Sequence, residues 1–190
     1  MAATHEVWLF RHAETEWSLS GRHTGRTDIP LTDAGRERAA KTEALIAGHD
    51  WAAVLSSPLG RARETAALAG LGDRAVDRDD LLEWDYGDYE GITTAEIQKT
   101  RPDWSLWTDG CPGGEQADDV GARVDRVIAE ALEADGDVAL FAHGHVLRVL
   151  GARWLEQPAA FGGRLALSTA SICVLGFEHG TRVTWRWNEA

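Results

Sequence analysis

The sequence predicts an α/β fold: a three-layer α/β/α sandwich whose sheet is mostly parallel and includes an antiparallel strand. Residues 7–12 and 138–143 each begin with a short apolar run typical of a buried strand, and each end on a histidine. Segments with helical signals alternate with such strands along most of the chain. With 190 residues and no linker or low-complexity tract, we expect a single domain over residues 1–190.

The predicted strands are short apolar or β-branched runs bounded by polar residues. In chain order they span residues 7–10, 53–56, 137–142, 171–177 and 182–187, with a further strand and turn within 74–82. The last two flank His179-Gly180, where glycine suits a tight turn. We therefore expect a hairpin at the C-terminal end of the sheet.

The predicted helices lie between these strands. They span residues 32–48, 57–70, 93–100, 115–134 and 145–156, and residues 102–114 are expected to be a loop. Thr32 is a suitable N-cap for the first helix, and Gly48 a suitable end. Ser57 followed by Pro58 combines an N-cap with a favoured first helical residue, which predicts that the second helix begins there.

Composition excludes several classes of protein. The net charge of −12 argues against a nucleic-acid-binding surface, because such surfaces are basic. Cys111 and Cys173 are too few for a disulfide framework and fit a reducing compartment. No apolar stretch is long enough to span a bilayer or to form a signal peptide. We expect a soluble, cytoplasmic protein with no membrane partner.

The two strand-end histidines predict a ligand site. In open α/β sheets, ligands bind beyond the carboxyl ends of the strands. If the two strands are parallel neighbours, His12 and His143 meet there with Arg11 beside them. Arg61, in the first turns of a helix, adds a second guanidinium where the helix N-terminus also favours an anion. Imidazoles and guanidinium groups at one cleft indicate a site for a phosphate ester.

Four segments in chain order resemble the histidine phosphatase superfamily, also called the phosphoglycerate mutase-like family. They are LFRHAETEWS (9–18), SSPLGRARETA (56–66), LLEWDYGDYEG (81–91) and LFAHGHVLR (140–148). GRHTGRTDIPLTDAGRERA (21–39) and PGGE (112–115) are also similar to family segments. The resemblance covers nearly the whole chain and is greatest to small bacterial members of acid phosphatase type. It implies a phosphoglycerate mutase-like fold.

The resemblance also implies a role for each matching residue. His12 would be the nucleophile that becomes a phosphohistidine, and Glu83 the proton donor to the leaving oxygen. The implied catalytic set is completed by Arg11, Arg61 and His143. The implied substrate-binding set is Arg11, His12, Ser18, Thr24, Gly25, Arg61, Glu83, Tyr86, His143 and Gly144.

Elementary chemistry agrees with these roles. A phosphoryl group in transfer keeps negative charge on its oxygens, and an arginine fork that cannot deprotonate pairs with two of them. A neutral imidazole is a competent nucleophile. This scheme needs no metal and no cofactor. A zinc site made by His12, His143 and His145 is the alternative, but neighbouring arginines would repel a cation.

Three positions depart from the family pattern. Ala13 stands where glycine is usual, and would cost free energy if the backbone there needs a positive φ. Ser18 replaces the common asparagine, and His145 adds a third imidazole near the cleft.

Other assignments stay open. Asp85, Asp88 or Glu90 could replace Glu83 as the acid. Four aromatic residues either wall the entrance or pack in the core: Trp84, Tyr86, Trp104 and Trp107.

The leading function hypothesis is a phosphomonoesterase of broad specificity for small phosphorylated metabolites. The first alternative is a cofactor-dependent phosphoglycerate mutase, which is disfavoured because few basic residues lie between Glu83 and His143. The second is a catalytically weak phosphate-ester binding or signalling module. The expected binding partner is a small-molecule phosphate ester. The sequence does not identify the physiological substrate, and it is compatible with a homodimer.

Overall fold

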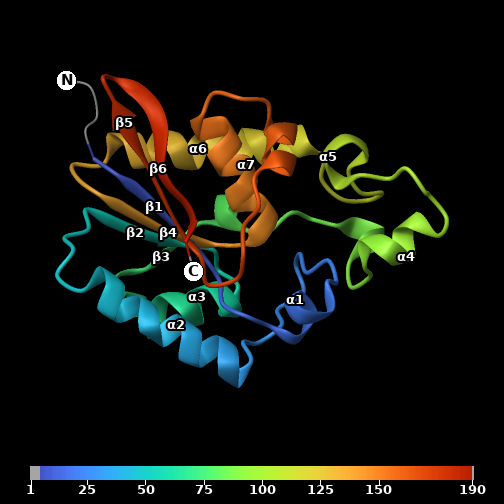
Figure 1. Cartoon of the computed structure of the whole chain (residues 1–190), viewed down its shortest axis with the longest axis horizontal. Helices are drawn as coiled ribbons and strands as arrows, with labels where there is room; N and C mark the ends of the chain where they lie inside the picture. Colours follow the sequence, from blue (N-terminus) through green and yellow to red (C-terminus); the bar gives the residue numbers. More distant parts are fainter. Residues whose placement is uncertain (1–4, 190) are drawn as a thin grey trace.

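Within residues 5–189 the sheet has six strands, in the order β3-β2-β4-β1-β5-β6 (Figure 1). The computed structural model describes residues 5–189. The strands are β1 (Val7–Arg11), β2 (Ala53–Ser56), β3 (Val76–Asp77), β4 (Val138–Ala142), β5 (Ile172–Glu178) and β6 (Thr181–Glu189). β3, β2, β4 and β1 are parallel, β5 is antiparallel to β1, and β6 is antiparallel to β5. Only β5 therefore runs against the others, which confirms the predicted fold class.

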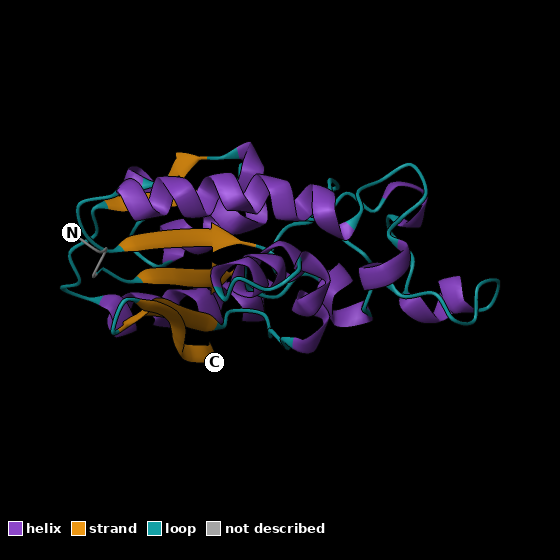
Figure 2. Ribbon diagram, turned by 90° about the horizontal axis from the view of Figure 1, so that it is seen from above, coloured by secondary structure: helices purple, strands orange, loops and turns teal. Residues whose placement is uncertain are grey.

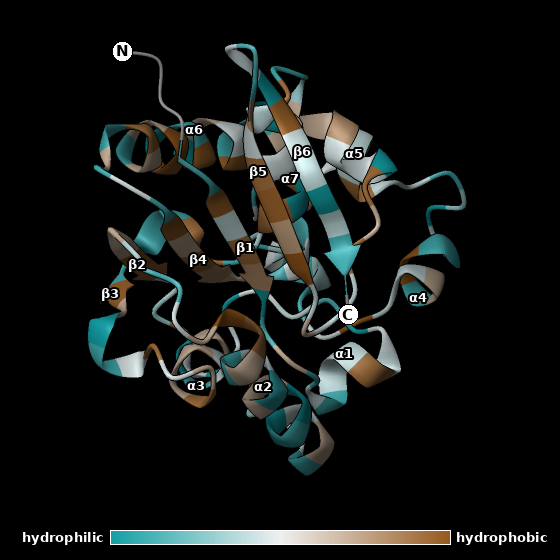
Figure 3. Ribbon diagram, turned by 60° about the vertical axis from the view of Figure 1, so that its left-hand side comes forward, coloured by the Kyte–Doolittle hydropathy of each residue, from teal (hydrophilic) through white to brown (hydrophobic). Residues whose placement is uncertain are grey.

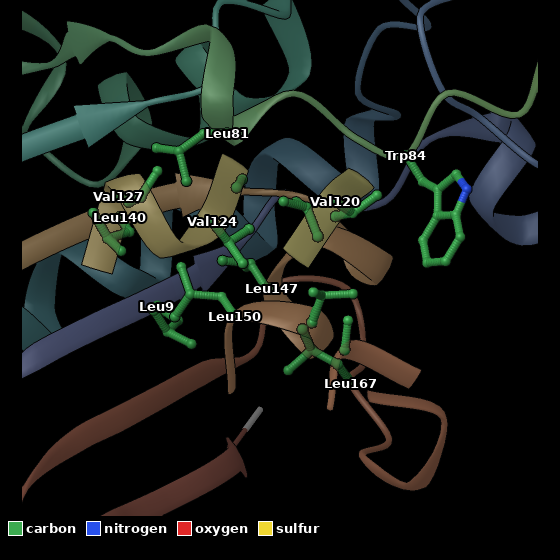
Figure 4. Packing of buried hydrophobic residues seen from close by; sticks show 14 of the residues in the cluster. Leu9, Leu81, Trp84, Val120, Val124, Val127, Leu140, Leu147, Leu150 and Leu167 are labelled. Atoms are coloured by element: carbon green, nitrogen blue, oxygen red, sulfur yellow. The ribbon is translucent and has the colours of Figure 1, made fainter. Parts of the chain in front are cut away.

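Helices cover both faces of this sheet. α2 (Asp33–Ile46) and α3 (Gly60–Leu68) lie on one face, and α6 (Ala117–Glu133) and α7 (Gly144–Trp154) lie on the other (Figure 1). Because side chains alternate along a strand, β1 contributes hydrophobic side chains to the packing on both faces of the sheet. Its Leu9 joins the hydrophobic cluster under α6 and α7 (Figure 4). The adjacent Phe10 joins a second cluster on the α3 side.

The shorter helical elements are α1 (Glu16–Ser20), α4 (Thr94–Gln98), α5 (Leu106–Asp109), η1 (Gly72–Arg74), η2 (Asp79–Leu81), η3 (Gly87–Tyr89) and η4 (Ala159–Arg164). The segment that carries α4 and α5 extends beyond the end of the sheet toward which the central strands point (Figure 2). This extension lies beside the edge where the sequence predicts the ligand site.

Most helices and strands lie where caps, turns and apolar runs in the sequence predict them. Thr32 caps α2 by accepting a hydrogen bond from Gly35 N at 3.0 Å, as predicted. The terminal hairpin is confirmed, with positive φ at both His179 and Gly180, as a two-residue hairpin turn requires. β6 forms an edge of the sheet and is more hydrophilic than β5 (Figure 3).

Two predictions about helices were wrong. α3 begins at Gly60 rather than at Ser57-Pro58, because the Ser57 hydroxyl contacts the His143 ring at 2.7 Å instead of capping the helix. The expected loop at 102–114 contains α5, which starts after Ser105. Among residues 5–189, every helix is too short or too polar to cross a membrane.

Candidate active site

The two strand-end histidines lie together, as the sequence predicts. β1 and β4 are parallel neighbours in which Arg11 pairs with Ala142. The backbone N–H of His12 continues the pairing by donating to the Ala142 carbonyl at 2.9 Å. The rings of His12 and His143 have their centroids 5.1 Å apart. The sheet register itself therefore brings both imidazoles to one edge.

The surroundings of His12 leave one ring nitrogen free. Its Nδ1 lies 2.7 Å from the Ala13 carbonyl oxygen. A carbonyl can only accept, so Nδ1 carries the proton and Nε2 keeps its lone pair. Burial lowers the pKa of His12 well below its ordinary value, and Arg11 and Arg61 lower it further, while the bond to Ala13 opposes them. This imidazole is therefore neutral, with a lone pair available on Nε2.

The backbone at Ala13 does not need the positive φ that would make alanine costly there. It is not among the residues with positive φ, it is fully buried, and its N–H donates to Thr65 Oγ1 at 3.1 Å. A methyl group is therefore compatible with the turn after His12.

His143 has the opposite tautomer. Arg61 Nε donates to His143 Nδ1 at 3.1 Å, so the ring proton lies on Nε2, which is 2.7 Å from Ser57 Oγ. Burial lowers the pKa of His143 well below its ordinary value, and the Arg61 charge and His12 add to this effect. His143 is thus a neutral hydrogen-bond donor beside His12.

Arg61 is fully buried, and its guanidinium donates hydrogen bonds to several protein groups. Besides His143, its guanidinium donates to the carbonyls of Thr27 at 2.8 Å and Gly25 at 2.9 Å. Asp28 lies 3.6 Å from Nη1. Gly25 also uses its N–H, which donates to the Glu90 carboxylate at 2.9 Å. The structure therefore places Gly25 behind Arg61 as its support.

Arg11 is the guanidinium with an unused donor. Its Nη1 donates to the Leu167 carbonyl, but its buried Nε has no hydrogen-bond partner among the described residues. A Cβ on Gly144 would lie 3.2 Å from Arg11 Cζ, so glycine permits this close packing. Because a buried charged donor without a partner is costly, the Nε position indicates a site for an anion.

Glu83 lies at the N-terminus of α7. Its Oε1 accepts from Trp84 N and Val146 N, and its Oε2 accepts from His145 N, each at 2.9 Å. Of the acidic residues considered from the sequence, only Glu83 lines the inner cavity described below. Asp85 lies 3.7 Å from Arg26 instead, and Glu90 binds the Gly25 loop.

Two adjoining cavities open at this edge, an inner one of about 90 Å³ and an outer one of about 420 Å³. The inner cavity is lined by Arg11, His12, Ser18, Arg22, Thr24, Glu83, Tyr86, Gly144, His145, Arg148 and Leu167. Arg61 and His143 lie behind this wall, fully buried. A larger hollow of about 770 Å³ between α2 and the β5–β6 edge contains none of these residues.

Three residues of the inner wall were not predicted from the sequence: Arg22, Arg148 and Leu167. For Arg148 a signal exists, because it follows His145 by three positions and so shares its face of α7. Of the four aromatic residues, Tyr86 lines the inner cavity and donates to or accepts from His145 Nδ1 at 2.6 Å. Trp104 and Trp107 line the outer cavity, whereas Trp84 packs in the core (Figure 4).

The zinc alternative finds no support in the site. Within residues 5–189, no three histidine, cysteine or acidic side chains are grouped so that they could hold a metal ion. The Nδ1 atoms of His12, His143 and His145 are each engaged in a hydrogen bond.

Comparison with known proteins gives a consistent result. The family model of the histidine phosphatase superfamily (branch 1) matches residues 7–190. An acid phosphatase of Mycobacterium tuberculosis is 47% identical over 182 residues, covering 94% of this chain and 89% of the relative. The solved structure of an M. tuberculosis open reading frame superposes with a TM-score of 0.93 at 43% identity, covering 98% of each chain. A mycobacterial glucosyl-3-phosphoglycerate phosphatase in complex with VO3 has a TM-score of 0.88 at 28% identity, covering 98% of this chain and 100% of the other.

Proposed function

The chain belongs to the histidine phosphatase superfamily, and we propose that this phosphatase hydrolyses small phosphorylated metabolites through a phosphohistidine at His12. One observation carries the proposal: a neutral imidazole with a free Nε2 shares a cavity with a guanidinium whose buried Nε has no partner in the described part of the chain. The first group is a nucleophile, and the second suits the anion that it would attack.

The proposed first step forms a P–N bond and breaks a P–O bond. The lone pair of His12 Nε2 attacks phosphorus, and the electron pair of the P–O bond leaves with the alcohol oxygen. Arg11 binds the equatorial oxygens, where charge is concentrated during transfer. The Nε2–H of His143 faces Ser57 Oγ at 2.7 Å behind the cavity wall, and Arg61 fixes that proton by donating to His143 Nδ1.

Glu83 is the proposed proton donor to the leaving oxygen. Its Oε1 has two backbone donors and its Oε2 has one, so Oε2 keeps a lone pair through which a proton passes. In the second step, water attacks phosphorus, Glu83 takes its proton, and the P–N bond breaks. Free phosphate and neutral His12 result. No step is assigned to a metal or cofactor.

The test is a search for the covalent intermediate. We expect the wild-type protein, mixed briefly with ³²P-labelled phosphate ester and quenched in alkali, to retain an acid-labile phosphoryl group. His12→Asn should retain none and should lose turnover of p-nitrophenyl phosphate. His179→Asn changes an exposed histidine in the β5–β6 turn and serves as the matched control. A phosphoenzyme that persists in His12→Asn would assign the nucleophile elsewhere.

Vanadate gives an independent check, because it mimics the transferring phosphoryl group and a relative has been solved with VO3. We expect vanadate and phosphate to compete with substrate. Activity in the presence of EDTA should equal that in its absence, and a loss reversed by zinc would revive the metal alternative.

We place the enzyme in the cytoplasm. Cys111 and Cys173 are free and buried, and burial raises the pKa of each thiol to about 12. Both would persist as thiols in a reducing compartment.

A further inference from the structure

Two arginines of the cavity wall have no part in the mechanism above. Arg148 projects from α7 into the inner cavity, and Arg22 lines both the inner and the outer cavity. Most other arginines of the chain pair with a carboxylate, as Arg78 does with Glu130 at 2.7 Å. Among residues 5–189, neither Arg22 nor Arg148 has a carboxylate within 4.0 Å.

Arg148 is held in place although it is unpaired. Its Nε donates to the Gly162 carbonyl at 3.0 Å, and its guanidinium lies over the Trp107 ring, 4.6 Å from the centroid. Burial lowers the pKa of Arg148, and Arg11 lowers it further, while Glu83 raises it. A fixed, partly buried cation without a counter-ion costs free energy, and a bound anion would offset that cost.

The charge distribution of the cavities also favours a bound anion. The chain has 31 acidic and 19 basic side chains apart from histidine, yet no aspartate or glutamate lines the outer cavity among the described residues. Among residues 5–189, Glu83 is the only carboxylate on the inner wall, and it shares that wall with three arginines. Arg11 has its proposed role with the transferring phosphoryl group, which leaves Arg22 and Arg148, neither of which has a described carboxylate within 4.0 Å.

We propose that Arg22 and Arg148 select phosphate esters that carry a second anionic group, a carboxylate or another phosphate, on the alcohol that leaves. The inference rests on the proposed function, because it assigns the outer part of the same cavity to the leaving group. The outer cavity of about 420 Å³ has room for such a group beside Trp104 and Trp107. Both arginines lie outside the segment between Glu83 and His143, in which sequence analysis found few basic residues.

The experiment compares esters that differ in the second anion. One pair is 2-phosphoglycerate and glycerol 2-phosphate, which differ by a carboxylate. The other is fructose 1,6-bisphosphate and fructose 6-phosphate, which differ by a phosphate. For the wild type we expect kcat/KM to be at least about tenfold higher for the doubly anionic member of one pair, since charge-assisted hydrogen bonds discriminate by about that factor. The pair that shows this higher kcat/KM identifies the second anion as a carboxylate or a phosphate.

The variants then assign the preference to residues. Arg22→Gln and Arg148→Gln should each lower the kcat/KM ratio about tenfold, mainly through KM, because the second anion is bound equally before and during transfer. Arg148→Lys keeps the charge and should restore part of the ratio. Arg38→Gln removes an exposed charge on α2 and should leave the ratio at the wild-type value, which controls for the change in net charge.

Arg148→Gln also removes the hydrogen bond to Gly162. If the Arg148→Gln variant does not fold, Arg22→Gln alone tests the inference. The side chain of Arg22 makes no hydrogen bond among residues 5–189, and its guanidinium only contacts the Trp17 ring, 5.9 Å from the centroid. Equal kcat/KM within both pairs in the wild type would overturn the inference, as would an unchanged ratio in Arg22→Gln. Turnover of p-nitrophenyl phosphate that depends on His12 would show that the proposed function survives that result. Its absence would refute the proposed function itself.

Discussion

Each of the two active-site histidines has its tautomer set by one neighbour. The Ala13 carbonyl accepts from His12 and leaves that ring a lone pair on Nε2, whereas the Arg61 guanidinium donates to His143 and leaves that ring an N–H on Nε2. A carbonyl and a guanidinium therefore give two identical side chains opposite tautomers, one with a lone pair on Nε2 and the other with an N–H there. Arg61 acts in this arrangement by positioning His143 as well as by its charge.

We predict that Arg61→Lys lowers kcat/KM by about 10²–10³, the loss typical when one preorganised donor of an active site is removed, because this guanidinium orients His143. One ammonium group cannot donate to His143 and also to the carbonyls of Thr27 and Gly25. The control is Arg63→Lys, two residues further along α3, where an exposed arginine pairs with Asp77. Steady-state kinetics should show a loss only at position 61, and near-normal turnover of Arg61→Lys would reduce this arginine to a structural role.

Ala13 gives a second prediction at the scale of one residue. Because its φ is not positive, glycine at this position gains nothing in the folded state and adds freedom to the unfolded chain. Ala13→Gly should lower the free energy of unfolding in urea by about 0.5–1 kcal/mol and should not raise kcat. A gain in stability would mean that alanine is strained there.

At the scale of elements, Glu83 joins the segment after η2 to the N-terminus of α7. The first N–H groups of a helix have no partner within the helix, and Glu83 accepts from two of them, at His145 and Val146. The proposed proton donor is therefore also the acceptor that fixes the helix bearing Arg148. Its removal should affect both chemistry and stability.

We predict that Glu83→Gln slows phosphorylation by an alkyl ester far more than by p-nitrophenyl phosphate, because nitrophenolate leaves without a proton. The amide NH₂ would also face a backbone N–H, and the free energy of unfolding should fall by about 1–3 kcal/mol. Single-turnover rates on the two esters measure the first effect and urea unfolding measures the second. Asp88→Asn, an exposed carboxylate of the same segment, is the control. Equal losses on both esters would assign the proton to another group.

The elements that could be predicted from sequence are those fixed by nearby residues. Thr32 caps α2 within three residues, and the His179-Gly180 turn closes its own hairpin. The start of α3 could not be predicted, because Ser57 is engaged by a histidine 86 positions away. The same holds for the cavity wall, since Arg22 and Arg148 meet there only after the sheet register has been set. Motifs located the residues that we propose to react, whereas the wall around them depends on packing between distant segments.

At the scale of the whole molecule, three buried or partly buried histidines of the site have lowered pKa values. His12 and His143 are buried, and burial lowers the pKa of each well below its ordinary value. For His145 burial is again the main cause, and Arg148, then His23 and Arg11, lower its pKa further. These imidazoles stay neutral in the folded protein at mildly acidic pH. In the unfolded chain they titrate near pH 6.5, the ordinary value for histidine.

This difference predicts that stability falls as the pH is lowered. Below about pH 6.5 the unfolded chain takes up protons that the folded protein does not. Proton binding lowers the free energy of the unfolded state, so stability decreases toward acid. At about pH 5 each such imidazole contributes up to about 2 kcal/mol to this loss, and Tm should drop by several degrees between about pH 7.5 and pH 5. His145→Asn removes one of these groups and should make the drop smaller, whereas His179→Asn, at an exposed turn position, should not. Thermal melts of the three proteins at the two pH values provide the measurement. A Tm that is flat or rises toward acid would show that the imidazoles are protonated in the folded state, and His12 could not then be the neutral nucleophile.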